Sequence, residues 1–125
     1  MARQVFVVDD EKVIADTLAV ILRSSGYQAT AFYNAQSALE QAGIRCPDLV
    51  ITDVVMPGMN GVEMAVLFRG RHPECKILLF SGQASTVNLL ATAAAQGSAF
   101  ELLTKPLHPT DLLARVATLW EPEIA

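Results

Sequence analysis

Short apolar runs alternate with segments of helical periodicity along the whole chain, and this alternation constrains the fold more than any other feature. Brief apolar runs bounded by turn residues are typical of strands that are buried on both faces. A regular alternation of such strands with helices predicts an α/β fold, with a parallel sheet covered by helices on both sides. In the first predicted helix, 11–24, the expected buried stripe consists of Val13, Ile14, Leu18, Ile21 and Leu22.

Residues that typically begin or end helices support this division into strands and helices. Gly26 and Gly43 are predicted to end helices, and Asn34 is a predicted N-cap. The length of 125 residues suits one domain, so we expect a single domain over 1–125 with no output domain in this chain. Strands are predicted at 4–8, 28–33, 48–53, 76–81 and 99–103, and helices at 11–24, 35–43, 61–70, 84–96 and 109–120.

Composition excludes several classes of protein. A hydrophobic content of 52% with 18% charged residues argues against disorder, and the net charge of −4 provides no basic surface for nucleic acid. The charge-free stretch 77–100 contains too many polar groups for a membrane span, and the N-terminus lacks a signal-peptide pattern. We therefore expect a cytoplasmic domain that binds neither membrane nor nucleic acid. Cys46 and Cys75 lack metal-ligand spacing and are predicted to be free thiols.

Acidic residues follow two of the predicted strands, and a lysine follows a third. Asp9 and Asp10 come after the first strand, Asp53 ends the third, and Lys105 follows the fifth. Open α/β sheets form their binding crevices at the carboxyl ends of strands, where these side chains are expected to meet. Mg²⁺, or Mn²⁺, prefers such oxygen ligands. Asp10 and Asp53 are expected to bind the ion directly, Asp9 directly or through water, and Val55 through its backbone carbonyl.

This combination of groups suits phosphoryl transfer to Asp53. A carboxylate is a weak nucleophile and the phosphoryl donor is anionic, so a metal ion that neutralises charge is needed. Lys105 would add a positive charge for one phosphoryl oxygen, and Ser81, at the end of its strand, would offer a hydroxyl to another. Gly58 and Gly61 are predicted to let the loop after Asp53 turn tightly.

Taken together, these motifs resemble the receiver domain of two-component response regulators, and the resemblance covers essentially the whole chain. It implies a flavodoxin-like, three-layer (βα)5 fold with strand order 2-1-3-4-5. It also implies that Asp53 accepts a phosphoryl group from a histidine kinase or histidine phosphotransfer protein, and that the domain is a phosphorylation switch that assists its own chemistry and is not an enzyme. The motifs are Asp9-Asp10, Asp53 followed by Met56-Pro57-Gly58-Met59-Asn60-Gly61, Ser81, and Lys105-Pro106.

The sequence departs from the family at the residue three before the lysine, where receivers usually carry Tyr or Phe. Here this residue is Leu102, and Phe100 lies two positions earlier. Either Phe100 takes the aromatic role through a bulge, or the switch works differently. The Lys105-Pro106 bond is open to both the cis and trans forms.

Two other functions compete with a phosphoacceptor. A phosphate-independent pseudo-receiver would serve only as an interaction module, although the intact acidic set counts against it. An aspartyl-phosphate hydrolase usually has a second acid close behind its nucleophile, whereas this chain has Val55. The neutral helix 84–96 is either a tightly covered, alanine-rich helix or, with the 99–120 segment, a homodimer or effector surface.

Overall fold

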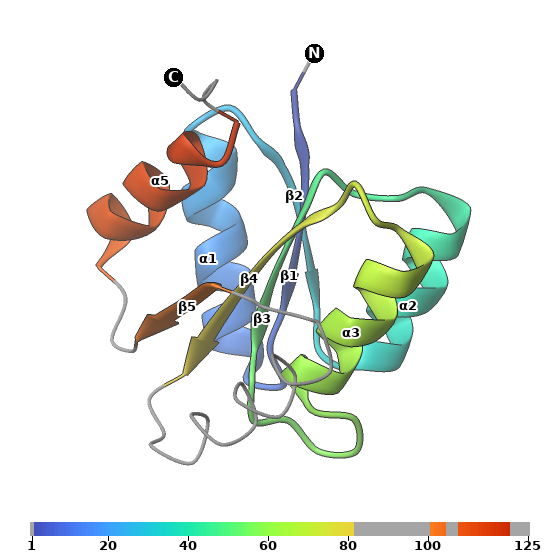
Figure 1. The fold of residues 1–125 in the computed structure, drawn as a ribbon. Coiled ribbons are helices and arrows are strands. Elements are labelled where there is room, and N and C mark those ends of the chain that lie inside the picture. Colours follow the sequence, from blue (N-terminus) through green and yellow to red (C-terminus); the bar gives the residue numbers. More distant parts are fainter. Residues whose placement is uncertain (1, 82–100, 105–107, 121–125) are drawn as a thin grey trace.

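The structure is a computed structural model that describes residues 2–81, 101–104 and 108–120. From β1 to β4, strands and helices alternate as the sequence predicts, and β5 is followed by α5 (Figure 1). The elements are β1 (Gln4–Val8), α1 (Lys12–Ser24), β2 (Gln28–Phe32), α2 (Ala35–Ile44), β3 (Leu49–Asp53), α3 (Gly61–Arg71), β4 (Lys76–Ser81), β5 (Glu101–Thr104) and α5 (Pro109–Thr118).

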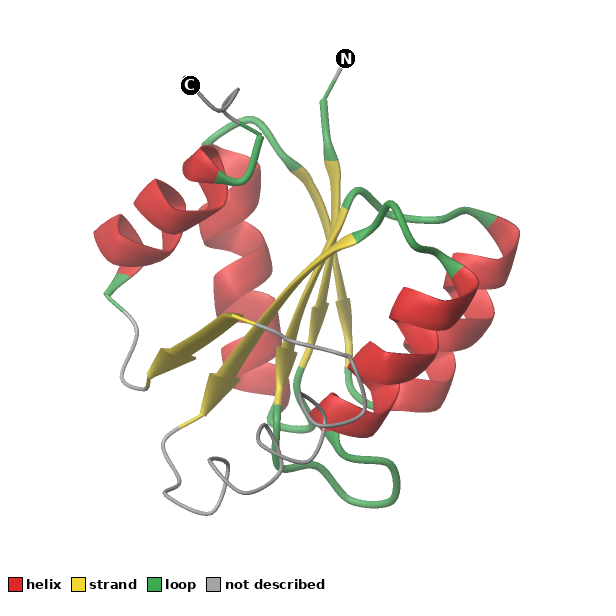
Figure 2. Cartoon of the chain, viewed as in Figure 1, coloured by secondary structure: helices red, strands yellow, loops and turns green. Residues whose placement is uncertain are grey.

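The strands form one five-stranded sheet in the order β2-β1-β3-β4-β5, and every neighbouring pair is parallel. Helices α1 and α5 cover one face, and α2 and α3 cover the other (Figure 2). The predicted fold class and strand order are therefore confirmed. Because all strands run the same way, their carboxyl ends meet at one edge of the sheet, at the bottom of Figure 1.

Side chains of the central strands alternate between two apolar layers. On β1, Val5 and Val7 pack toward α1 and α5, whereas Phe6 and Val8 pack toward α2 and α3. Every residue of β3 is buried. Burial on both faces explains why these strands read as continuous apolar runs. It also places the acid at the end of β3 on a rigid base.

The buried face of helix α1 differs from the predicted one at Val13. Its buried residues are Ala15, Leu18, Ala19 and Leu22, whereas Val13 is 79% exposed. Small alanines, and not the larger Val13, complete the stripe because the helix lies close to the sheet. The predicted stop is confirmed, since Gly26 follows the helix with a φ of 94° that L side chains rarely adopt.

Helix α2 begins as predicted at the Asn34 cap, whose side chain accepts a hydrogen bond from the backbone N–H of Ser37 at 2.8 Å.

Trp120, near the C-terminus, packs against the α1–α5 layer. Its ring lies 6.3 Å from that of Tyr27, and the Arg3 guanidinium lies 4.3 Å from the ring centre.

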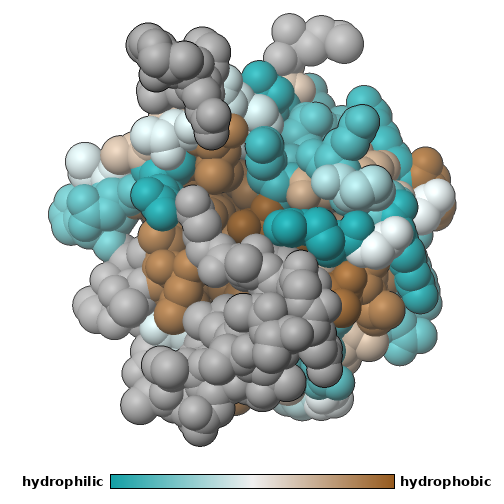
Figure 3. Space-filling view, in the orientation of Figure 1, coloured by the Kyte–Doolittle hydropathy of each residue, from teal (hydrophilic) through white to brown (hydrophobic). Residues whose placement is uncertain are grey.

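The described surface mixes polar and apolar residues. Polar side chains dominate the flanks in the view of Figure 3, and apolar side chains show near the centre. Within the described ranges, no helix has the length and apolar character needed to cross a membrane.

Candidate phosphorylation and metal site

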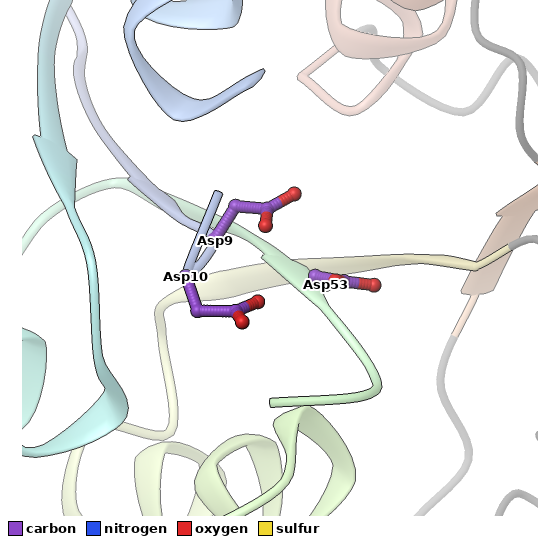
Figure 4. Close-up of side chains that lie close together, drawn as sticks. All are labelled: Asp9, Asp10 and Asp53. Carbon is purple, nitrogen blue, oxygen red and sulfur yellow. The ribbon is translucent and has the colours of Figure 1, made fainter. Parts of the chain in front are cut away.

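Three carboxylates gather at the carboxyl edge of the sheet. Asp9 and Asp10 follow β1, and Asp53 is the last residue of the adjacent strand β3. One carboxylate oxygen of each lies within 4.8 Å of those of the other two. Figure 4 shows the three side chains side by side at the ends of these strands. The parallel β1–β3 pairing thus brings together the acids that the sequence singled out.

The two neighbouring aspartates differ in their surroundings. Asp9 is fully buried, whereas Asp10 is exposed. The backbone N–H of Asp9 donates to the carbonyl of Phe32 at 3.0 Å, which extends the β1–β2 pairing by one residue. Its side chain accepts a 2.9 Å hydrogen bond from the backbone N–H of Glu11. Asp9 is therefore held in place, and Asp10 faces solvent at the mouth of the site.

The backbone of Asp53 is held in the sheet. The side chain is only 6% exposed, and the Thr52 hydroxyl donates to the Asp53 carbonyl at 2.9 Å. Asp53 pairs with Phe80 on β4, and the next N–H, that of Val54, donates to the Phe80 carbonyl at 3.2 Å. The sheet therefore defines the position of this carboxylate before any ligand binds.

Helix α3 begins in direct contact with Asp53. A Cβ on Gly61 would overlap the carbonyl oxygen of Asp53 and lie 2.9 Å from its carbonyl carbon. The Gly61 N–H also donates to the Val54 carbonyl at 2.8 Å. Gly58 does turn with a φ of 75°, as expected, but Gly61 does not have a positive φ. Gly61 therefore serves the tight loop through close backbone approach to Asp53, and not through a positive φ.

A capping box holds the start of α3, and the sequence analysis missed it. The Asn60 side chain accepts from the Glu63 N–H at 2.8 Å, and the Glu63 carboxylate accepts from the Asn60 N–H at 3.1 Å. The signal was present, because a polar cap followed three residues later by Glu is typical of this motif. The box fixes the end of the loop that follows Asp53.

Ser81 lies at the same edge as the acids. It ends β4, is 4% exposed, and stands one residue beyond the strand partner of Asp53. Val55 lies in the loop after β3 and is 42% exposed. The structure thus brings Ser81 and the loop of Val55 to the acidic edge, as the sequence analysis expected.

Several predicted features lie outside the described residues: Lys105 and its bond to Pro106, Phe100, and the helix expected at 84–96. Leu102 is described. It is half-buried, pairs with Leu79, and packs against the α2–α3 layer. The β4–β5 register runs without interruption from Glu101 to Thr104, so the described part of β5 contains no bulge.

The donor set fits a hard divalent cation. All three side chains offer oxygen, the ligand that Mg²⁺ and Mn²⁺ prefer. The close approach of three like charges, two of them on buried residues, is unfavourable unless positive charge compensates it. Among the described His, Cys, Asp and Glu residues, these three aspartates form the group that lies close enough together to bind one ion.

Solved structures of similar chains have the same fold as this chain. The chemotaxis protein CheY4 of Vibrio cholerae matches with a TM-score of 0.84 and 26% identity, covering 95% of this chain and 99% of that one. A CheY-like response regulator receiver domain protein of Methanospirillum hungatei JF-1 matches with a TM-score of 0.85 and 25% identity, covering 94% and 93%.

A longer protein contains a similar part. NtrX of Brucella abortus matches with a TM-score of 0.82 and 29% identity over 94% of this chain, which spans only 26% of the NtrX chain. A sequence model of the response regulator receiver domain matches residues 5–117. With this match over nearly its whole length, and with the sheet order described above, the chain belongs to the response regulator receiver domain family.

Proposed function

We propose that this domain accepts a phosphoryl group on Asp53 in a Mg²⁺-dependent reaction and changes conformation to signal in a two-component phosphorelay. The observation that carries the proposal is the grouping of Asp9, Asp10 and Asp53, with carboxylate oxygens within 4.8 Å of one another. Within a receiver domain, such a group at the carboxyl ends of β1 and β3 would provide both a nucleophile and the ligands for a metal ion.

Asp53 would be the nucleophile. Its carboxylate oxygen attacks the phosphorus of the donor, the bond from phosphorus to the donor atom breaks, and an acyl phosphate forms on Asp53. The hydrogen bonds around its backbone hold the carboxylate at the sheet edge, so little reorganisation precedes the attack. A phosphohistidine on a sensor kinase or phosphotransfer protein is the donor implied by the family.

Asp10, Asp53 and the Val55 carbonyl would hold Mg²⁺, with Asp9 binding directly or through water. When bound, the ion neutralises charge between the carboxylate and the incoming phosphoryl group. Asp9 is well suited to a supporting role, because it is buried and its side chain already accepts a hydrogen bond from Glu11. Asp10 is exposed, so its oxygens are accessible to an ion arriving from solvent.

Ser81 and Lys105 would receive the phosphoryl oxygens. The buried hydroxyl of Ser81 stands next to the strand partner of Asp53, and its donation to a phosphoryl oxygen would couple phosphorylation to β4. Lys105 follows β5 directly and would contribute a positive charge. Lys105→Ala should preserve Mg²⁺ binding but disconnect phosphorylation from output; a normal output would contradict this role.

Incubation with acetyl phosphate and Mg²⁺ tests the main proposal. Intact-mass measurement should show the addition of one phosphoryl group to the wild-type chain and none to Asp53→Asn. Asp111→Asn is the matched control, because Asp111 is an exposed acid in the first turn of α5. It should be phosphorylated as the wild type is. Phosphorylation of Asp53→Asn to the wild-type level would refute the assignment of the acceptor.

The same assay separates the alternatives. No uptake from acetyl phosphate or from a cognate kinase would favour a pseudo-receiver that acts only by binding. Sustained turnover of small phosphate esters would favour a hydrolase. The Val55 side chain at the second position after Asp53 argues against the hydrolase, since it can neither donate nor accept a proton.

A further inference from the structure

The two cysteines lie together at the edge of the sheet opposite the acids. Cys46 precedes β3 and Cys75 precedes β4, and these strands are parallel neighbours with Leu49 paired to Lys76. The Lys76 N–H donates to the carbonyl of Asp48 at 3.0 Å, so the pairing continues toward both thiols. The strand register thus brings together residues that are distant in sequence.

The thiols interact with each other. The two side chains lie near enough for each thiol to affect the pKa of the other, and each sulfur lies 3.4 Å from the carbonyl oxygen of the residue that follows it. Both cysteines are free. Within the described part of the chain, they do not belong to a group spaced for metal binding. Two neighbouring reduced thiols, without a metal site, are candidates for disulfide formation.

Access to the pair is one-sided. Cys75 is 4% exposed, whereas Cys46 is exposed and lines an open cavity of about 590 Å³ beside Arg3 and Arg45. A small oxidant from solvent therefore meets Cys46 first. Cys75 stands behind it, where it can react only with a partner that is already in contact.

We propose that Cys46 and Cys75 are a peroxide-sensitive thiol pair that closes a reversible disulfide between the starts of β3 and β4. The Cys46 thiolate attacks a peroxide oxygen, the O–O bond breaks, and Cys46 becomes a sulfenic acid with release of hydroxide. The Cys75 thiolate then attacks the Cys46 sulfur and expels a second hydroxide. Overall, two thiols are oxidised to a disulfide and hydrogen peroxide is reduced to two waters.

The rate of this reaction depends on the pKa values of the two thiols. Burial raises the pKa of Cys75 to about 12, and burial also raises the pKa of Cys46, while the neighbouring Cys75 thiol opposes that rise. Because thiolates are the reacting species, the rate should increase with pH. The closed ring would contain β3, Asp53 and α3, so oxidation would cross-link the segment that carries the acceptor.

Hydrogen peroxide applied to the full chain at about pH 9, the ordinary pKa of a thiol, tests the proposal. In the wild type, both thiols should disappear together with a loss of about 2 Da, as two hydrogens leave. Peptide mapping should link Cys46 to Cys75, and dithiothreitol should restore both thiols. A stable oxidised Cys46 beside an unreacted Cys75, or a disulfide between two chains, would overturn the proposal.

Two variants resolve the order of events. Cys75→Ala should stop at a Cys46 sulfenic acid that a 1,3-diketone probe captures. Cys46→Ser should leave the Cys75 thiol unreacted over the time in which the wild type closes its disulfide. Equal oxidation of Cys75 in the presence and absence of Cys46 would show that Cys46 is not the first site of attack.

In the wild-type chain, a glutathione redox buffer measures whether the folded structure favours the disulfide. The disulfide should form at least about tenfold more favourably in the native chain than in urea. The oxidised chain should then melt at a temperature about 3–6 °C higher than the reduced chain. An equal or weaker tendency in the native chain would mean that the contact does not favour the bond. Because these measurements need no phosphoryl donor, their outcome is independent of the proposed phosphorylation.

Discussion

The two edges of the sheet carry different chemistry, although the same strands build both. The carboxyl edge collects Asp9, Asp10 and Asp53, whose like charges are held close together. At the amino edge, the acid Asp48 is used differently: its carboxylate accepts a 2.8 Å hydrogen bond from the backbone N–H of Gln4. One edge therefore concentrates acidic groups that could hold a metal ion, and at the other edge an acid forms a hydrogen bond within the fold.

Under the proposed function, the carboxyl edge is the place where this domain would give up stability for function. Functional sites commonly contain groups that would be more stable apart, and structural sites do not. The edges should accordingly respond in opposite ways when an acid is neutralised. Substitutions at the two edges should therefore separate them, with the largest effect expected at the acidic group.

Asp10→Asn should remove most of the stabilisation that Mg²⁺ gives the wild type. At a Mg²⁺ concentration of one hundred times Kd, binding stabilises the folded state by about 2.7 kcal/mol. Without Mg²⁺, the variant should melt at a higher temperature than the wild type, because one of three crowded charges is gone. Thermal unfolding with and without Mg²⁺ provides both comparisons. An unchanged Mg²⁺ response would remove Asp10 from the site.

Gly61→Ala should lower the free energy of unfolding by about 1–3 kcal/mol, since the new methyl group must displace the backbone of Asp53. It should also slow phosphoryl uptake. Gly70→Ala, in the same helix, is the control: apart from the helix backbone, no atom of the described residues lies within 4 Å of its added Cβ, so the variant should gain about 0.4–1 kcal/mol. Urea unfolding measures both, and equal effects would contradict the close approach.

Cys75 should give the amino edge an alkaline dependence. The folded pKa of about 12 exceeds the ordinary value of 9.0, so the folded chain holds this proton more tightly than the unfolded chain. The resulting stability is complete below pH 9 and is lost as the pH rises toward 12, with a slope of at most about 1.4 kcal/mol per pH unit.

Cys75→Ala should therefore show a shallower decline of stability over that pH range. Urea unfolding of both chains under reducing conditions measures the difference in slope, and the slope is insensitive to any constant loss from the missing sulfur. Parallel curves would show that this thiol keeps its ordinary acidity in the fold.

Asp48→Asn should have the smallest effect and the opposite sign from Asp10→Asn. Weakening the hydrogen bond from Gln4 should cost about 1 kcal/mol, and the Mg²⁺ response should be unchanged. The same thermal unfolding series measures it. Stabilisation by Asp48→Asn would break the contrast between the two edges.

The apolar runs made the strands predictable. The predicted bounds of the first and fourth strands agree with β1 and β4, because both are buried on two faces. The grouping of Asp9, Asp10 and Asp53 was also predictable, since parallel strands place their carboxyl ends together. The strand order came only from the family resemblance, because alternation alone does not specify which strands are neighbours.

Other features depend on packing that local sequence does not reveal. Val13 fits an apolar stripe, yet α1 contacts the sheet through Ala15 and Ala19 instead. The contact between Cys46 and Cys75 arises from the β3–β4 register, to which their spacing in sequence gives no clue. Gly61 is a similar case, since only the path of the chain shows that its missing side chain makes room for Asp53.

The hydrogen bond from Gly61 to Val54 pins the two ends of the loop after Asp53 together. Residues 55–60 therefore form an interchangeable cassette on a fixed base, with Gly58 at its turn. Under the proposed function, a loop of the same length from another receiver, placed between these two anchors, should change the lifetime of the phosphorylated state and leave the backbone of Asp53 in place. Such an exchange would have to preserve a backbone carbonyl at position 55, the proposed metal ligand.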